Sequence, residues 1–233
     1  MYTLKGRVGY SETSTDGRIS IVSIVNHMQN TSSYEYYQLG TSFDFLRELG
    51  QVWILNSWQI VFEKRPKVYE DISIRTWAYD YSDVFGYRNY VLEDANGEVC
   101  AYANSVWVMT DAKTGRPTKA LERSRIGYSG EPRFEMDYQD RKIIMPIDME
   151  EIESFYVKRN QLDTHLHVNN VKYIEMALQY LPEDFELKQL RIQYIRSAIL
   201  GDKITAKLTN KDGKIYISLD SDEGKPFATL ELS

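Results

Sequence analysis

The feature that most constrains this chain is a pattern of predicted elements that occurs twice. In each half, apolar residues at helical spacing are followed by runs that alternate apolar and polar residues, with turn signals between them. The predicted helices cover residues 21–39, 43–49 and 168–181, and the predicted strands cover 52–63, 71–80, 87–94, 98–111, 153–159, 187–196, 203–210, 214–220 and 227–232. A repeated helix and antiparallel meander predicts duplication of one helix-plus-sheet unit.

The two halves can also be overlaid along the chain. Residues 59–65 and 70–72 match residues 190–196 and 201–204 at one offset, because 196 − 65 and 202 − 71 both equal 131. We therefore predict an α+β fold of two units, each a long helix wrapped by a curved antiparallel sheet, with the two sheets joined edge to edge. We expect a first domain at 1–120, a polar crossover linker at 121–151 and a second domain at 152–233.

Composition excludes several classes of protein. The 233 residues are 42% hydrophobic and 27% charged, which is enough apolar material for a core and argues against a disordered chain. The net charge of -6 argues against a nucleic-acid binder. No stretch reaches about 18 consecutive apolar residues and the start has no signal region, so we expect a cytoplasmic protein without a membrane span. The single cysteine, Cys100, excludes an internal disulfide, and we expect a buried structural thiol.

The residues that could carry chemistry gather just before the second long helix. Asp163, His165 and His167 stand at alternate positions there. A carboxylate and two imidazoles can supply a general base and a hydrogen-bond donor, and a helix N-terminus stabilises developing negative charge. Three other interpretations stay open: a polar cap of the helix, a metal site without an obvious fourth ligand, and a solvated loop.

At this point the sequence resembles a known family. Leu162-Asp163, followed by His167-Val-Asn-Asn-Val-Lys-Tyr173, is similar to the active-site segment of the fatty acyl-ACP thioesterases of plants and bacteria. The resemblance runs from about residue 10 to residue 230, and its other segments are Val25-Asn-His-Met-Gln29, Gly86-Tyr-Arg88, Ser105-Val-Trp-Val-Met109 and Thr114-Gly-Arg-Pro117. That family is built as two fused hot-dog domains, which agrees with the repeat.

The resemblance implies hydrolysis of the thioester between a fatty acyl chain and the phosphopantetheine arm of acyl carrier protein (ACP), with no cofactor and no metal. Asp163 and His167 match active-site positions of the family, whereas His165 stands where the family usually has Asn. Ser197 stands where the family commonly has Glu, so either Ser197 holds a water in place of the Glu or Asp163 and His167 suffice without it. Asp163 could attack the thioester directly or activate water, and both routes stay open.

Further residues are expected to bind the substrate. The backbone N–H groups of Val168, Asn169 and Asn170, where the second helix begins, are the expected oxyanion donors. The resemblance implies that the first half holds the acyl chain, so Trp53, Trp58 and Trp107 would line its tunnel, with core packing as the alternative for each. An acidic carrier protein needs a basic dock, for which the candidates are Arg88, Arg116, Lys119, Arg123, Arg125, Arg191 and Arg196.

Two other functions remain open. A thioesterase acting on acyl-CoA would need the same residues. An acyl-binding double hot-dog protein without hydrolysis would explain why Ser197 replaces the Glu of the family. Paired hot-dog units commonly associate further, so a homo-oligomer is compatible with either function.

Overall fold

The computed structural model describes residues 1–41, 43–125 and 130–233, which form two compact units. The first unit comprises Met1–Leu55 and Ile60–Tyr138, and the second comprises Asn56–Gln59 and Gln139–Ser233. No helix within the described residues is long and apolar enough to span a membrane.

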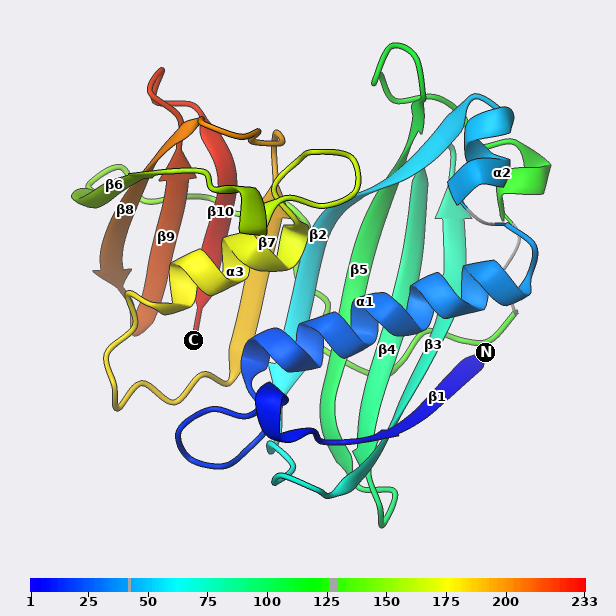
Figure 1. Ribbon diagram of the computed structural model, residues 1–233, viewed down its shortest axis with the longest axis horizontal. Coiled ribbons are helices and arrows are strands. Elements are labelled where there is room, and N and C mark those ends of the chain that lie inside the picture. Colours follow the sequence, from blue (N-terminus) through cyan, green and yellow to red (C-terminus); the bar gives the residue numbers. More distant parts are fainter. Residues whose placement is uncertain (42, 126–129) are drawn as a thin grey trace. The chain divides into compact units, whose positions relative to one another are not determined.

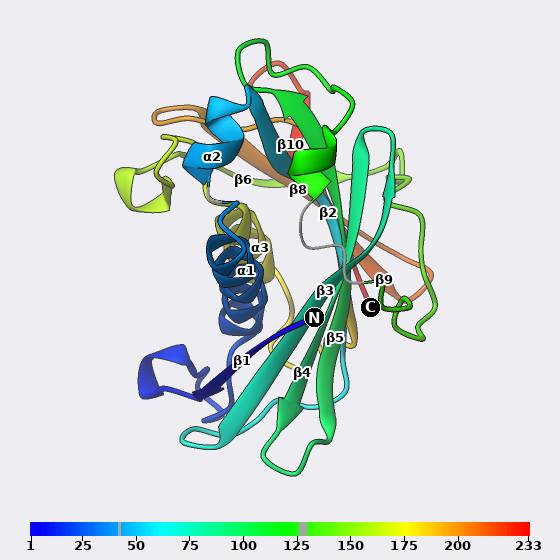
Figure 2. The ribbon, with the colours of Figure 1, turned by 90° about the vertical axis from the view of Figure 1, so that its right-hand side faces the viewer.

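The first unit is an antiparallel sheet with a long helix on one face (Figures 1 and 2). Its strands lie in the order β1-β3-β4-β5-β2, and helix α1 packs on β1, β3 and β4. The elements of this unit are β1 (Tyr2–Arg7), η1 (Tyr10–Glu12), α1 (Ile21–Gln38), α2 (Phe43–Glu48), β2 (Gln51–Phe62), β3 (Asp71–Ser82), β4 (Phe85–Asp94), β5 (Val99–Asp111) and η2 (Glu122–Arg125).

Local chemistry explains where α1 begins and which face it buries. The Ser20 hydroxyl accepts a hydrogen bond from the Ser23 N–H at 3.0 Å, which caps the first turn. Ile24, Val25 and Met28 follow at helical spacing and are fully buried against the sheet. The helix predicted at 21–39 is thereby confirmed to within one residue.

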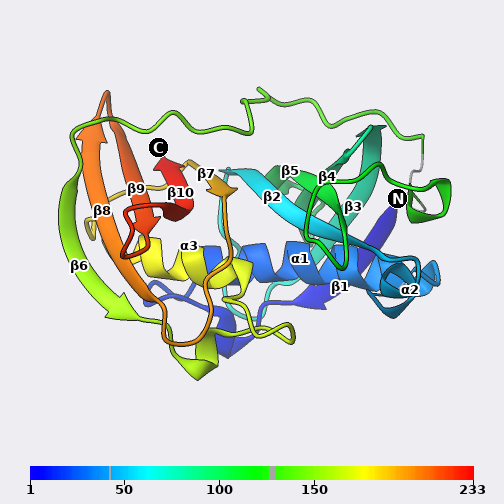
Figure 3. The same cartoon turned by 90° about the horizontal axis from the view of Figure 1, so that it is seen from above.

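The second unit has the same plan with a shorter helix. Its strands lie in the order β7-β10-β9-β8-β6, and helix α3 packs alongside β9 (Figure 3). The helix buries Val171, Ile174 and Ala177 on its inner face. The elements are β6 (Glu150–Tyr156), η3 (Arg159–Gln161), α3 (Asn170–Leu178), β7 (Gln189–Tyr194), β8 (Lys203–Lys211), β9 (Lys214–Asp220) and β10 (Pro226–Leu232).

The predicted α+β fold of two helix-plus-sheet units is confirmed, but the predicted offset between them is wrong by one residue. The Ile19 N–H donates to the Pro66 carbonyl, and the Val168 N–H donates to the Ala198 carbonyl. Pro66 and Ala198 are therefore equivalent residues, and the offset between the two units is 198 − 66 = 132 residues. The overlay of the sequences used an offset of 131 residues. Because side chains alternate along a strand, a slip of one residue exchanges the two faces.

Candidate active site

The candidate residues lie on one loop, residues 162–169, which leads from η3 into α3. Leu162 and Val168 form a β-bridge, the Asp163 N–H donates to the His167 carbonyl at 2.7 Å, and the Leu166 N–H donates to the Asp163 carbonyl at 3.1 Å. Leu166 has a φ of 63°, in the left-handed region. The loop is therefore a tight turn closed by a left-handed residue, a geometry that usually takes glycine.

The Asp163 carboxylate holds this loop together. Its Oδ1 accepts hydrogen bonds from the N–H of His165 at 2.7 Å and from the N–H of His167 at 3.2 Å. Its Oδ2 takes part in neither bond. The interpretation of these residues as a helix cap is wrong, because the Asn169 side chain caps α3 by accepting from the Val171 N–H at 3.0 Å.

A second segment, residues 195–202, runs beside the loop. His167 forms a β-bridge with Ile199, and the Val168 N–H donates to the Ala198 carbonyl at 2.9 Å. Side chains alternate between the two faces of such a ladder, and here Val168 and Ala198 are buried while His167, Ser197 and Ile199 are exposed. The fold thus brings Ser197 and His167 to the same exposed face.

Two tyrosines brace the place where the loop, α3 and the second segment meet. The Tyr194 hydroxyl donates to the Asn170 carbonyl at 3.0 Å, and the Tyr173 hydroxyl accepts from the Ala198 N–H at 2.8 Å. Their rings meet edge to face, with 5.9 Å between centroids. Burial raises the pKa of Tyr173 to about 12 and the pKa of Tyr194 well above its usual value, so both phenols stay protonated at neutral pH.

Sequence reasoning missed this bracing role of the two tyrosines. Their signal was present: a Tyr in the first turns of the predicted helix and a Tyr near the end of the strand that leads to Ser197. Tyr side chains inside a protein need a partner for the hydroxyl, and the backbone at a helix start and at a strand end offers one.

The prediction that three backbone N–H groups bind the oxyanion needs correction, because two of the three already donate to carbonyl groups of the protein. The N–H groups of Val168 and Asn169 already donate to the carbonyls of Ala198 and Gln161, each at 2.9 Å. Asn170 is the first residue of α3, so the helix itself leaves its N–H unused. Of the three proposed donors, Asn170 is the one compatible with binding an oxyanion.

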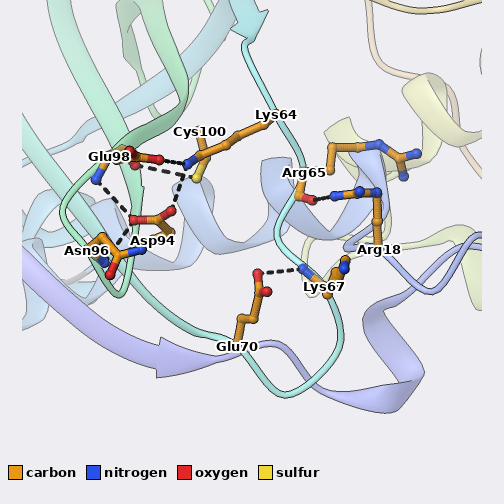
Figure 4. A network of polar contacts seen from close by, with 9 residues as sticks. All are labelled: Arg18, Lys64, Arg65, Lys67, Glu70, Asp94, Asn96, Glu98 and Cys100. Carbon is orange, nitrogen blue, oxygen red and sulfur yellow. Dashed lines mark hydrogen bonds and ion pairs between the residues drawn. The ribbon is translucent and has the colours of Figure 1, made fainter.

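The first unit contains the equivalent loop at residues 13–20, and there the same face is occupied by its own charges. The Ser14 N–H donates to the Arg18 carbonyl, just as the Asp163 N–H donates to the His167 carbonyl in the second unit. The two loops are therefore equivalent at an offset of 149 residues (163 − 14 and 167 − 18). Arg65, which is equivalent to Ser197, forms an ion pair with Asp16, and Arg18 Nη1 donates to the Arg65 carbonyl at 2.8 Å (Figure 4).

Neighbouring charges in the first unit are also paired (Figure 4). Lys64 binds the carboxylates of Asp94, at 2.7 Å, and Glu98. Beside them Cys100 is fully buried, and burial raises the pKa of its thiol to about 11. The predicted structural thiol is confirmed. In the equivalent loop of the second unit Asp163 is half-buried and His167 is exposed, and among the described residues neither of these two side chains forms an ion pair like that of Arg65 with Asp16.

A metal site at Asp163, His165 and His167 was one open interpretation. Within residues 1–41, 43–125 and 130–233, no group of three or more His, Cys, Asp or Glu side chains lies close enough to hold a metal ion. The half-buried Asp163 carboxylate and the exposed imidazoles of His165 and His167 are groups that can act in acid–base chemistry.

Comparison with known proteins decides the family. The model of the acyl-ACP thioesterase N-terminal domain matches residues 1–127, and that of the C-terminal domain matches residues 144–228. The chain belongs to the acyl-ACP thioesterase family. The C-terminal match of this family includes the loop 162–169 and Ser197, and the N-terminal match includes the equivalent loop of the first unit.

Relatives and solved structures agree with this membership. The chain is 30% identical to a palmitoyl-acyl carrier protein thioesterase of Cuphea hookeriana over 79% of its length, and 27% identical to oleoyl-acyl carrier protein thioesterase 2 of Arabidopsis thaliana over 91%. It spans 49% and 62% of these two relatives. The crystal structure of an acyl-ACP thioesterase from Bacteroides thetaiotaomicron has a TM-score of 0.90 at 20% identity, with 99% of this chain and 96% of that chain covered.

A further solved structure supports the fold. The 12:0-ACP thioesterase from Umbellularia californica has a TM-score of 0.87 at 16% identity, and the match covers 100% of this chain and 96% of that chain. The predicted fold of two hot-dog domains is thereby confirmed.

The three tryptophans expected to line an acyl tunnel are all packed side chains. Trp53 Nε1 donates to the Ser124 carbonyl at 3.0 Å, and Trp107 Nε1 donates to Ser105 Oγ at 2.8 Å. Trp58 is buried in the second unit. Trp53 and Trp107 share an apolar cluster of the first unit with Phe45, Leu46, Tyr81, Met109 and Ala120. A role of these tryptophans in binding the acyl chain stays a prediction.

Two of the seven candidates for a basic dock cannot serve in it. Arg88 is 2% exposed and ion-paired with Glu35, and Arg191 is 8% exposed and 3.0 Å from Glu231. Buried, paired guanidinium groups cannot bind a partner's carboxylates. The Arg123 side chain lies outside the described part of the chain, whereas the side chains that reach solvent at least in part are those of Arg116, Lys119, Arg125 and Arg196.

Proposed function

We propose that this chain is an acyl-ACP thioesterase, which hydrolyses the thioester of fatty acyl-ACP to free fatty acid and holo-ACP. The observation that carries the proposal is the loop of the second unit, which holds the half-buried Asp163 and the exposed His167 and runs beside the segment that contains the exposed Ser197. Membership of the family and the names of the plant relatives support this substrate class.

In the proposed mechanism, the residues of the loop divide the proton transfers between them. Asp163 Oδ2 takes a proton from water as the water oxygen attacks the thioester carbon. The oxyanion that forms is stabilised by the Asn170 N–H and by the N-terminal end of α3. The carbon–sulfur bond then breaks, His167 donates a proton to the leaving sulfur, and the proton that Asp163 took from water replaces it, which restores both side chains. His165 contacts the substrate or the water. In the alternative route Asp163 attacks the carbon itself, and water hydrolyses the resulting anhydride.

The proposal is tested by incubating the purified chain with a panel of acyl-ACPs of different acyl length and measuring free fatty acid. We expect hydrolysis of at least one acyl-ACP, with a kcat/KM at least about tenfold higher than for the CoA thioester of the same acyl chain. Faster turnover of the CoA thioesters across the panel would contradict the assignment of the carrier. Hydrolysis of neither thioester would contradict the enzyme assignment.

One observation favours a second candidate function, acyl binding without hydrolysis: Ser197 stands where the family commonly has Glu. An acyl-binding protein without hydrolysis would need no carboxylate at this exposed position. The two functions differ in whether the unchanged chain releases fatty acid at all.

Position 197 can therefore be tested directly. We expect Ser197→Glu to raise hydrolysis of acyl-ACP and Ser197→Ala to lower it modestly, because a charge-assisted hydrogen bond to the attacking water or to His167 is worth ~1.5–3 kcal/mol, or about ten- to a hundredfold in rate. The measurement is kcat of both variants. If both match the parent, position 197 lies outside the site. If only the Glu variant hydrolyses, the acyl-binding function is the better description of the natural chain.

A further inference from the structure

Leu166 stands at a position that the fold otherwise gives to glycine. Its counterpart in the first unit is Gly17, and both residues close the same turn in the left-handed region, with φ of 63° and 71°. A leucine there carries backbone strain that glycine avoids. Its side chain is 70% exposed, so burial in the core does not compensate for the strain. A strained, exposed apolar side chain beside a candidate catalytic loop points to a contact outside the chain.

Two more exposed aliphatic side chains, those of Ile199 and Leu200, belong to the segment that runs beside Leu166 and His167. Because His167 pairs with Ile199, the same register places Leu166 opposite Leu200. Ile199 and Leu200 are 50% and 49% exposed. The equivalent residues of the first unit are Lys67 and Val68, so the first unit lacks this surface. We call Leu166, Ile199 and Leu200 the aliphatic lip of the candidate site.

Three cations belong to the segments that carry or precede the aliphatic lip, and the Gly201 N–H, which follows Leu200, donates to the Val157 carbonyl, which precedes Lys158. Lys158 and Arg159 precede the catalytic loop, and Arg196 lies next to Ser197; all three are exposed, and within the described part of the chain none of them forms an ion pair. The Arg196 guanidinium is held over the Phe227 ring at 4.6 Å. Its counterpart in the first unit, Lys64, is neutralised by Asp94 and Glu98. Lys225 and, with a smaller effect, Arg196 lower the pKa of the Glu223 carboxyl, so Arg196 is also near this acidic group. The second unit therefore combines exposed aliphatic groups with exposed cations that form no ion pair among the described residues, in a chain whose net charge is -6.

We propose that the aliphatic lip, with Lys158, Arg159 and Arg196, is the docking surface for the acidic carrier protein that presents the thioester. This proposal rests on the proposed function. Apolar contacts at the centre and charge pairs at the rim are the usual arrangement of such an interface, and the cations complement an acidic partner rather than a second copy of this acidic chain. The position of the lip beside His167 would direct the acyl-bearing arm of the docked carrier toward the catalytic loop.

The test compares Leu166→Gly, Leu200→Ser and a matched control, Tyr69→Gly. Tyr69 is an exposed left-handed residue of the first unit, with a φ of 70°, whose counterpart in the second unit is Gly201. We expect both lip variants to raise KM for acyl-ACP about tenfold with little change in kcat, and to leave KM for the same acyl-CoA unchanged. Tyr69→Gly is expected to leave both values unchanged.

Salt provides an independent readout of the flanking cations. We expect KM for acyl-ACP to rise with ionic strength in the parent, and to rise less steeply in Arg196→Gln. Leu200→Ser lies outside the catalytic loop, so it keeps the proposal testable if Leu166→Gly disturbs the positions of Asp163 and His167.

Four outcomes would overturn the docking surface. The first is a parental KM for acyl-ACP in both lip variants. The second is an equal loss on acyl-ACP and acyl-CoA, which would place the lip against the shared pantetheine arm. The third is a parent chain that is dimeric by light scattering while the lip variants are monomeric. The fourth is a KM for acyl-ACP that does not depend on salt. A parent that hydrolyses acyl-CoA but no acyl-ACP would instead refute the proposed function.

Discussion

Replacing Asp163 by Asn is expected to lower kcat on acyl-ACP by about 10²-fold or more while the chain stays folded. The amide oxygen of Asn can accept the same two hydrogen bonds that Asp163 Oδ1 accepts from the N–H groups of His165 and His167. The amide cannot take a proton from water or attack a thioester. The substitution thus separates the chemical role of Asp163 from its role in holding the loop. Initial rates of fatty acid release at saturating acyl-ACP provide the measurement.

The control for this variant is Asp163→Ala, which removes both roles. We expect the Ala variant to lose activity to the same extent and also to lower the free energy of unfolding by about 1–3 kcal/mol, because two backbone N–H groups lose their acceptor. The Asn variant should unfold in urea at the parental midpoint. Near-parental hydrolysis by Asp163→Asn would show that the carboxylate is only structural.

The largest expected effect on stability comes from the first unit, at the buried pair of Arg88 and Glu35. The side chains of both residues are almost fully buried, and Arg88 Nη1 donates to the Glu35 carboxylate and, at 3.1 Å, to Thr76 Oγ1. The guanidinium also lies 5.1 Å from the centroid of the Tyr36 ring. We expect Arg88→Met to lower the free energy of unfolding by about 3–5 kcal/mol, because Glu35 would remain buried without a counterion.

The matched control replaces both partners. The double variant Arg88→Met with Glu35→Leu leaves no buried charge, so we expect it to recover most of the stability lost in the single variant. Urea denaturation of the parent and of the three variants, including Glu35→Leu alone, measures the coupling. An Arg88→Met variant within about 1 kcal/mol of the parent would contradict the inference that the substitution leaves Glu35 buried without a counterion.

Regular periodicity made the main elements predictable. Ile24, Val25 and Met28 identify α1 because one helical face carries them, and the alternation in the first halves of β2 and β3 reflects one buried and one more exposed face of a sheet. The order of helix and strands, used twice, was enough to predict two units of the same plan. The strand β1 (Tyr2–Arg7) was missed because it lies at the edge of the sheet with mostly exposed side chains, so little alternation marks it.

Register and burial of charge were the features that sequence reasoning could not supply. Matching Arg65 to Arg196 rather than to Ser197 seemed natural because both are arginines, but hydrogen bonds to Pro66 and Ala198 determine the true equivalence. Arg88 was considered for a basic dock because composition reports charge and not depth. A charged side chain becomes buried when a partner such as Glu35 meets it from another element, which only the tertiary fold determines.

The position of the candidate residues in the fold was predictable, but their environment was not, and their role in catalysis stays a prediction. Asp163 and His167 were identified from their spacing before a helix, and the loop that carries them is present. The neighbouring segment with Ser197 and Ile199, the tyrosine brace and the strained Leu166 depend on contacts between segments about 30 residues apart in the chain. Once loop 13–20 is recognised as the counterpart of loop 162–169, the sequence shows Leu166 at the position that Gly17 occupies in the first unit, which indicates the strain.

The central claim is that the second unit carries the active site and that the equivalent face of the first unit does not. The most direct test is one experiment on two equivalent positions: kcat/KM for acyl-ACP of His167→Gln and of Arg18→Gln, followed as release of the holo-ACP thiol. We predict a loss of about 10²-fold or more for His167→Gln and a value within about threefold of the parent for Arg18→Gln. Equal effects of the two substitutions, or the larger loss in Arg18→Gln, would contradict the account.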